Sequence, residues 1–336
     1  MQSRFGILAA MPQEVAELSK HVTGQREHKR GSIFTFVTGE LDGKPVVYAA
    51  ANVGMVFAAS AATTMIGEFG ASALLFTGVA GGLRPGQKIG DIVIGEDVVN
   101  YEMDCRAFSY AWDPEYKLQL GEMPFVGWRF FEADAALLAL ALEAPRPEGF
   151  DVVKGRIATG SVFLSAHAKQ SLLERVWEPL GRPLCAEMEN AGVAQVCRAY
   201  GVPYVSLRAL SDLLTGDASA DFNAFCEAAA NHLVPIVRYV VQRYSVNSVG
   251  SDDDVAKAEL RVLKEQEAAE MATKAKADAE KAKKKEAEEA ANQACAEALE
   301  KDGKRVAGGV HKFDASEVDV HGGDATADDL HDAFGI

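Results

Sequence analysis

The chain has 336 residues, of which 48% are apolar and 25% are charged, and its formal net charge is −15. That length suits one large α/β domain with an appendage, and the apolar share is enough for a sizeable core. The acidic balance argues against non-specific binding to nucleic acid or to an anionic membrane surface.

The cysteines and the apolar segments indicate in which cellular compartment the protein is expected. Five cysteines lie at wide, irregular spacings that match neither a zinc site nor a disulfide framework. The apolar run Phe5–Met11 is too short for a signal peptide. The longest apolar region, Val46–Met65, is interrupted by Asn52 and Gly54 and falls short of a transmembrane span. We therefore predict a cytoplasmic protein that does not enter a membrane.

Strand-like and helix-like segments alternate over residues 1–244. In chain order we predict a strand at Phe5–Ala10, a helix that begins near Glu14, strands at Ile33–Val37 and Pro45–Ala50 around an Asp42-Gly43 turn, and a helix at Met55–Phe69. There follow a strand at Ala73–Thr77 that runs into a glycine-rich turn at Gly78–Gly82, strands at Asp91–Ile94 and Val98–Tyr101, a helix at Ala133–Glu143, a strand at Gly155–Thr159, a helix at Asn190–Tyr200, a strand at Tyr204–Ala209 and a helix at Asp221–Tyr244. This alternation predicts a layered α/β domain with an at least partly parallel sheet.

The composition changes after Tyr244. Residues 1–244 carry a net charge of −6, whereas residues 245–336 carry −9. We predict a linker over 245–251, a helical extension rich in Ala, Lys and Glu over 252–302, and an acidic, disordered tail over 303–336. No apolar heptad persists through the extension, so a solvated single helix is favoured over a coiled coil. The tail could recruit a protein partner.

Four segments carry the residues suited to chemistry. They are Ala10-Met11-Pro12-Gln13-Glu14-Val15, Thr77-Gly78-Val79-Ala80-Gly81-Gly82-Leu83, Ala186-Glu187-Met188-Glu189-Asn190-Ala191 and Arg208-Ala209-Leu210-Ser211-Asp212. Three of them directly follow strands, and ligands of open α/β sheets bind beyond the carboxyl ends of strands. Their polar side chains could therefore converge on one crevice.

Each segment alone also has a structural explanation. The glycines could form a tight turn, since neither dinucleotide nor P-loop spacing is present. Glu187 and Glu189 would share one face of an extended segment, which could be a solvated edge. Asp212 could cap a helix, and Glu14 could be an acidic residue favoured in a first helical turn.

Together and in this order, the segments resemble the 5'-methylthioadenosine/S-adenosylhomocysteine nucleosidases of the nucleoside phosphorylase superfamily. The likeness covers roughly residues 4–244, through AAMPQEV, TGVAGGL, IGDIVI, the Asp104–Tyr110 stretch, AEMENAGVAQVC and LRALSDL. It implies a three-layer αβα sandwich around a mixed, mostly parallel sheet. It also implies a homodimer that hydrolyses the N-glycosidic bond of an adenosine derivative.

The resemblance assigns roles residue by residue. Glu14 corresponds to the glutamate that engages the attacking water, and Asp212, steadied by Ser211, to the acid that protonates the base. Glu189 corresponds to the residue that holds the ribose hydroxyls, with Met188 beside the sugar. Phe163 would stack on adenine, the backbone of Leu164 would read its edge, and Phe222 would lie near the 5'-substituent. The remaining substrate-binding candidates are Val79, Ala80, Gly81 and Glu187.

The residue types fit this chemistry. Adenine is a poor leaving group as an anion, and a buried carboxylic acid that keeps its proton near neutral pH can protonate N7. Carboxylates stabilise the positive charge that develops on the ribose, and one ionised carboxylate can accept hydrogen bonds from two neighbouring hydroxyls. No cofactor is implied, and the histidines show no metal-ligand spacing.

Three departures from the family pattern concern the substrate. Val79 stands where some members carry serine, Ser161 stands where many carry aspartate, and the stretch Ala111–Trp128 is longer than usual. A phosphate-dependent purine nucleoside phosphorylase is the nearest alternative, and Arg84 could serve it as a phosphate ligand. A non-catalytic nucleoside-binding or storage protein of the same fold is the second. Deletion of residues 245–336 is expected to leave turnover intact.

Overall fold

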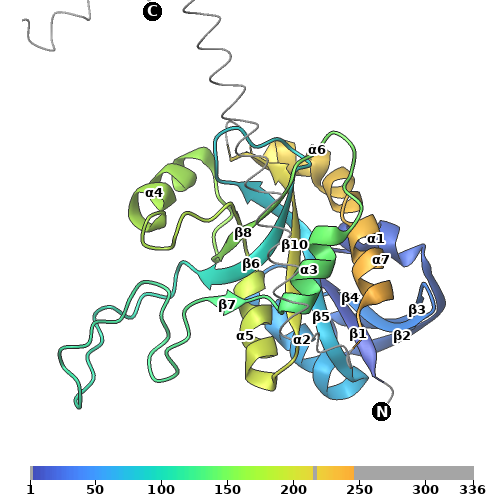
Figure 1. Cartoon of the computed structure of the whole chain (residues 1–336), viewed down its shortest axis with the longest axis horizontal. Helices are drawn as coiled ribbons and strands as arrows, with labels where there is room; N and C mark the ends of the chain where they lie inside the picture. Colours follow the sequence, from blue (N-terminus) through green and yellow to red (C-terminus); the bar gives the residue numbers. More distant parts are fainter. Residues whose placement is uncertain (1–2, 215–217, 246–336) are drawn as a thin grey trace, which may run out of the picture. The chain divides into compact units, whose positions relative to one another are not determined.

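The computed structural model describes residues 3–214 and 218–245, all of which belong to one unit of the chain, Met1–Lys264 (Figure 1). Its elements are β1 (Arg4–Ala9), α1 (Pro12–Ser19), β2 (Val22–Arg30), β3 (Phe34–Leu41), β4 (Lys44–Ala50), α2 (Met55–Phe69), β5 (Ala71–Gly82), β6 (Ile92–Asn100), β7 (Phe131–Glu132), α3 (Ala135–Glu143), β8 (Val152–Thr159), α4 (Ala166–Val176), β9 (Cys185–Glu187), α5 (Asn190–Tyr200), β10 (Tyr204–Asp212), α6 (Ala218–Asn231) and α7 (Val234–Arg243). The predicted helical extension (252–302), the predicted tail (303–336) and the predicted linker (245–251) apart from Ser245 lie outside the described residues.

The strands form one mixed sheet in the order β10-β6-β8-β9-β5-β1-β4-β3-β2, with β7 beside β6. β10 pairs with β6 on one side and with β5 on the other, so β5, β10, β6, β8 and β9 close into a ring. The central pairs β1–β4, β1–β5 and β10–β5 are parallel, as predicted. Antiparallel pairing is more extensive than expected because β2, β3 and β4 form a meander.

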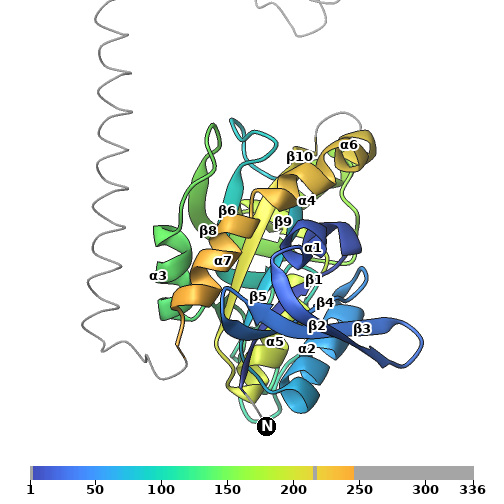
Figure 2. The same ribbon diagram turned by 90° about the vertical axis from the view of Figure 1, so that its right-hand side faces the viewer.

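Helices cover both faces of the sheet and give the predicted layers (Figures 1 and 2). One core lies between the sheet and α1, α3, α6 and α7, and includes Leu18, Leu137 and Val237. The other lies between the sheet and α2 and α5, and includes Met65 and Val193. No helix in the described part of the chain combines the length and apolar character needed to cross a membrane.

Two helices have the predicted limits because glycines end them. α2 stops before Gly70 and α5 stops before Gly201, and both glycines adopt left-handed φ angles of 69° and 64°. Only glycine takes this conformation without steric cost, and it is the usual residue just after a helix. The sequence signal for both ends is therefore strong.

Other predicted elements were wrong in their limits. Gly78–Gly82 is not a turn, because β5 continues through Gly82. Asp221–Tyr244 is not one helix but two, α6 and α7, with Pro235 in the first turn of α7. Proline tolerates that position because the first-turn N–H groups have no intrahelical acceptor.

Candidate active site

A cavity of about 240 Å³ opens where β1, β5, β9 and β10 end. The structure brings all the site residues named from the sequence to its wall: Glu14, Val79, Ala80, Gly81, Phe163, Leu164, Glu187, Met188, Glu189, Ser211, Asp212 and Phe222. Met11 and Val53, which the sequence did not single out, also line it. Residues far apart in the chain thus face one small space.

Glu14 is fixed at the start of α1. It occupies the third helical position, where a glutamate can accept from the N–H that precedes the helix. Its Oε2 accepts from the N–H groups of Ala10 (2.9 Å) and Met11 (2.8 Å), and its Oε1 accepts from Val79 N–H (2.8 Å). A carboxylate offers about four acceptor positions, so Oε1 retains a lone pair for a ligand.

Two glycines of β5 let these charged groups approach the strand. A Cβ on Gly78 would clash with Arg208 Nη1 and lie 2.5 Å from Glu14 Oε1, and a Cβ on Gly81 would lie 2.7 Å from Leu214 Cδ2 and 3.0 Å from Asp212 Oδ1. A side chain at either position would displace these groups. Gly78 therefore allows two charged side chains to pack against the strand, and Gly81 allows Leu214 and Asp212 to do so.

Arg208 holds the acidic side of the cavity together. It is fully buried on β10 and donates from Nη2 to Glu187 Oε2 (2.5 Å) and from Nη1 to Val79 O (3.3 Å). Its Nη2 also lies 3.9 Å from Glu189 Oε2. Arg208 is not among the site residues predicted from the sequence, although an arginine inside an otherwise apolar strand is a recognisable signal, since buried arginines are almost always paired.

The two glutamates beside Arg208 differ in what they can do. Glu187 Oε2 also accepts from the N–H groups of Glu189 (3.1 Å) and Asn190 (2.9 Å), and Oε1 accepts from Thr159 Oγ1. Glu189 Oε1 accepts from Gly54 N–H (2.8 Å), which ties it to the start of α2. Glu187 is therefore saturated by protein donors and supports the site, whereas Glu189 keeps acceptor capacity for a ligand.

Arg208→Met should lower the free energy of unfolding by about 3–5 kcal/mol, because it leaves Glu187 buried without its cation. Urea denaturation of the purified protein measures this loss. Arg238→Met is the matched control, since it removes the partially exposed partner of Asp42 (2.7 Å) and should cost no more than about 1 kcal/mol. Equal losses in the two variants would contradict a supporting role for Arg208.

Asp212 ends β10 and is only 3% exposed. Its Oδ1 accepts from Leu214 N–H (3.1 Å), and its Oδ2 accepts from Ser211 Oγ (3.0 Å). Lys169 of α4 donates to Leu213 O (2.8 Å) and to Gly82 O (3.1 Å), so it joins the segment after Asp212 to the end of β5. Neither α4 nor this role for Lys169 was predicted from the sequence.

The rest of the wall is apolar. Phe163 and Phe222 meet edge to face with ring centroids 5.8 Å apart, and Leu164 is buried beside them. Such a surface accepts a flat ring or an alkyl group. The cavity therefore has an acidic side and an apolar side.

Burial changes the acidity of two carboxyl groups. It raises the pKa of Glu14, and Arg208 and the three N–H donors only partly oppose that effect. Burial, together with neighbouring Glu187, raises the pKa of Glu189 to about 7. Carboxyl groups that titrate near neutrality in a cleft are typical of catalytic sites. The arrangement can stabilise a cation, bind hydroxyls and move a proton.

Comparisons with known proteins bear on the same part of the chain. The family model described as "Phosphorylase superfamily" matches residues 4–242. The 5'-methylthioadenosine/S-adenosylhomocysteine nucleosidase of Actinobacillus succinogenes is 36% identical over 234 residues, covering 70% of this chain and 96% of the relative. The Neisseria meningitidis nucleosidase solved with methylthio-immucillin-A has a TM-score of 0.65 and 31% identity, covering 73% of this chain and all of the other. The futalosine hydrolase of Helicobacter pylori has a TM-score of 0.63 and 31% identity, covering 72% and 98%.

Proposed function

Since the chain belongs to the phosphorylase superfamily, we propose that it is a purine nucleosidase that hydrolyses the N-glycosidic bond of 5'-methylthioadenosine, S-adenosylhomocysteine or both. The observation that carries this proposal is the meeting of Glu14, Glu189 and Asp212 around one cavity. The products are adenine and the corresponding 5-thio-ribose.

Each carboxyl group has one task in the proposed reaction. Asp212 gives its proton to N7 of adenine as the bond between C1' and N9 breaks. Glu189 accepts hydrogen bonds from the two ribose hydroxyls, and Glu14 takes a proton from the water whose oxygen bonds to C1'. The electron pair of the broken bond stays on the base, and both carboxylates stabilise the positive charge on the sugar.

The surroundings of Glu14 favour water over phosphate as the nucleophile. A carboxylate at this position repels a phosphate dianion but accepts a hydrogen bond from water. Arg84, which the sequence offers as a phosphate ligand, is exposed, donates to Arg182 O (3.1 Å) and does not line the cavity. These features support hydrolysis.

The deciding experiment is a substrate panel with purified full-length protein. 5'-Methylthioadenosine, S-adenosylhomocysteine and futalosine are each incubated with and without phosphate, and the free base and the sugar product are identified. We expect adenine release without phosphate, with a free sugar as the second product. A requirement for phosphate would establish the phosphorylase alternative. Preference for futalosine would make futalosine, and not an adenosine derivative, the substrate. Absence of any released base would favour a binding protein.

The proposed role of Glu189 predicts a pH dependence. Because its pKa is raised to about 7, the ionised form that accepts from the hydroxyls is lost as pH falls below that value. Glu14 has a raised pKa too, so kcat/KM should decline steeply towards acid pH. Glu189→Gln should be slower overall and show a shallower acid limb. An acid limb of unchanged slope in this variant would argue against the assignment.

We also propose that the chain forms a homodimer. Aromatic side chains cluster on the loop between β6 and β7, where the ring centroid of Tyr110 lies 4.8 Å from that of Trp112 and 5.8 Å from that of Phe125. Despite these contacts, Trp112 is 73% and Phe125 72% exposed. This loop projects from the body of the domain (Figure 1). Val56 of α2, close to the cavity residue Val53, is also exposed. Exposed apolar groups of this kind are typical of protein interfaces.

Sedimentation velocity tests the homodimer. We expect the full-length protein to sediment as a dimer, and Val56→Asp or Trp112→Glu to shift it towards the monomer, because each places a charge in an apolar interface. Lys29→Glu, which changes an exposed residue of β2, should leave the dimer intact. A monomeric wild type would end this proposal without affecting the one for the reaction.

We keep the cytoplasm as the expected compartment. Cys105, Cys185, Cys197 and Cys226 are free thiols, and disulfides are typical of proteins from oxidising compartments.

A further inference from the structure

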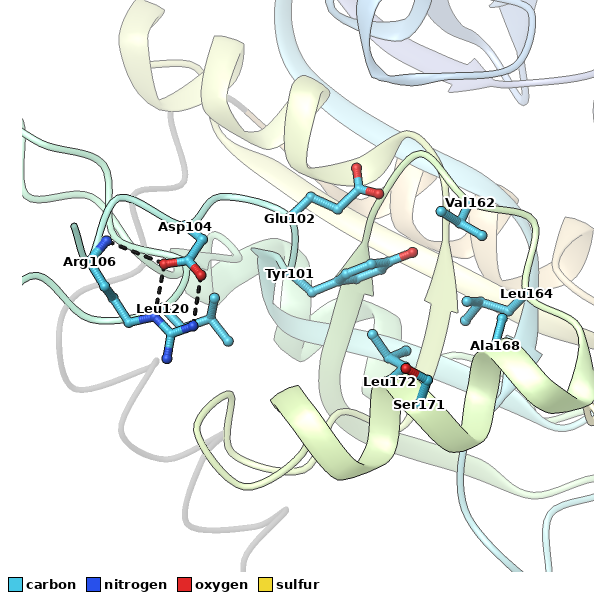
Figure 3. Close-up of a pocket in the computed structure, with 10 residues that line it drawn as sticks. All are labelled: Tyr101, Glu102, Asp104, Arg106, Leu120, Val162, Leu164, Ala168, Ser171 and Leu172. Atoms are coloured by element: carbon cyan, nitrogen blue, oxygen red, sulfur yellow. Dashed lines mark hydrogen bonds and ion pairs between the residues drawn. The ribbon is translucent and has the colours of Figure 1, made fainter. Parts of the chain in front are cut away.

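A second cavity, of about 670 Å³, lies beside the first. Its walls are the loop that follows β6, the Val162–Leu164 segment and one side of α4 (Figure 3). Val162 and Leu164 line both cavities. The volume is in the range of sites that bind small molecules.

Tyr101 carries an unmet polar group at this cavity. The residue is only 7% exposed, and among the described residues no group makes a hydrogen bond of normal geometry with its hydroxyl, although the Val162 N–H acts on it as a weak donor. Figure 3 shows its ring extending from the β6 side towards Val162. The ring packs on Gly160, where a Cβ would lie 2.0 Å from its Cζ atom, so it cannot withdraw in that direction. A buried hydroxyl without a hydrogen bond of normal geometry is costly, and a ligand would remove that cost.

The charged side chains that line the second cavity indicate which kind of ligand it can bind. Glu102 lines the cavity and uses Oε2 to accept from Ser161 N–H (2.7 Å), which leaves other lone pairs of its carboxylate for a ligand. Arg106 is held in a bidentate pair with Asp104 (2.8 and 2.7 Å). Its charge is thereby neutralised, so Glu102 sets the local sign.

The electrostatic environment of Tyr101 agrees with this sign. Burial, followed by the charge of Glu102, raises the pKa of Tyr101 to about 12, so the phenol remains neutral and available for hydrogen bonding. A metal ion has too few ligands there, since the described residues contain no group of three or more His, Cys, Asp or Glu side chains arranged to hold one. Among cations, this favours an organic one.

We propose that this second cavity binds a small organic cation, an ammonium group carried on an apolar body. The ammonium group lies between the Glu102 carboxylate and the Tyr101 hydroxyl, and donates to both. The apolar body packs on Leu120, Leu164 and Leu172, which are buried side chains of one small core. Since each cavity also has lining residues of its own, among them Tyr101 and Glu102 in the second and Glu14 and Asp212 in the first, we expect the cation and a ligand of the first cavity to be bound together.

Calorimetric titration of the full-length protein with 2-phenylethylamine tests this site. We expect the amine to bind at least about tenfold more tightly than 2-phenylethanol or 3-phenylpropionate, its neutral and anionic counterparts. The titration is repeated with saturating adenine, and binding of the amine should persist. Equal affinities for the three probes, or no heat with any of them, would overturn the proposal.

Three variants test whether the amine binds at the second cavity. Glu102→Gln should weaken binding of the amine by about tenfold or more. The amide oxygen of the introduced glutamine can still accept from Ser161 N–H. Tyr101→Phe removes only the hydroxyl and should weaken the amine several-fold without loss of thermal stability. Glu115→Gln, which removes an exposed carboxylate elsewhere on the same loop, is the matched control. Binding that adenine displaces and Glu102→Gln leaves unchanged would assign the amine to the first cavity and exclude the second.

Discussion

Asp212→Asn is expected to lower kcat by about 10²–10⁴-fold, the usual contribution of a positioned acid. Asparagine has the same shape, and its Oδ1 can still accept from Leu214 N–H while its Nδ2 donates to Ser211 Oγ. The cavity is therefore preserved, and only the transferable proton is lost. Initial rates of adenine release at saturating substrate measure the effect, with thermal unfolding as the check on folding.

A change of leaving group separates proton donation from other roles of Asp212. If adenine is replaced by 4-nitrophenolate, the departing group needs no protonation. The loss of kcat caused by Asp212→Asn should then be a few-fold at most, because this leaving group departs without receiving a proton. An equal deficit with both leaving groups would show that Asp212 acts by position or charge and not as an acid.

The cavity residues were accessible from the sequence because they lie in short, contiguous motifs at element ends. Glu14 lies five residues after the last residue of β1, and Ser211 and Asp212 end β10. Met188 and Glu189 lie between β9 and α5. In each case a strand ends at the polar residue or a few residues before it, and such ends face a common crevice in α/β proteins. Local patterning therefore indicated that these groups could converge, and the family resemblance supplied their roles.

The supporting interactions were not accessible, because they depend on distant pairs. Arg208 bonds to Val79, 129 residues away, and Lys169 bonds to Gly82 and Leu213, which are 87 and 44 residues away. Nothing local indicates either pairing. The glycines of β5 were taken for a turn for the same reason, since their need for space arises only when Glu14 and Arg208 pack against them.

Four of the described elements were not predicted from the sequence: β7 and β9 are only two and three residues long, and β2 and α4 are mostly polar. β2, with sequence VTGQREHKR, is an edge strand on which most side chains are exposed. Charged edge strands discourage pairing with other molecules, and the same charge hides the strand from a search for apolar alternation. α4, with sequence AHAKQSLLERV, is mostly polar, although its Leu172 is buried. Elements with few large apolar residues are recognised from their tertiary contacts.

Glu14→Gln is expected to lower kcat by at least about 10²-fold, for a reason different from that of Asp212→Asn. A glutamine amide cannot take a proton from water. Its single oxygen can accept from Ala10 and Met11, but its NH₂ group then faces Val79 N–H, which loses its acceptor. The kinetic defect should persist with 4-nitrophenolate as the leaving group, because water must still be activated. The two variants are thus distinguished by one substrate.

Stability gives an independent measure of the same carboxyl group. The pKa of Glu14 is raised in the folded protein, chiefly by burial, so its contribution to stability is present at low pH and is lost as pH rises through that pKa. Glu14→Gln has no such loss. The free energy of unfolding of the variant, relative to wild type, should therefore improve from acid to alkaline pH, even though the unmet Val79 N–H costs about 1–3 kcal/mol throughout. A pH-independent difference would mean that Glu14 does not titrate abnormally, and a variant that keeps near-normal kcat would remove Glu14 from the proposed activation of water.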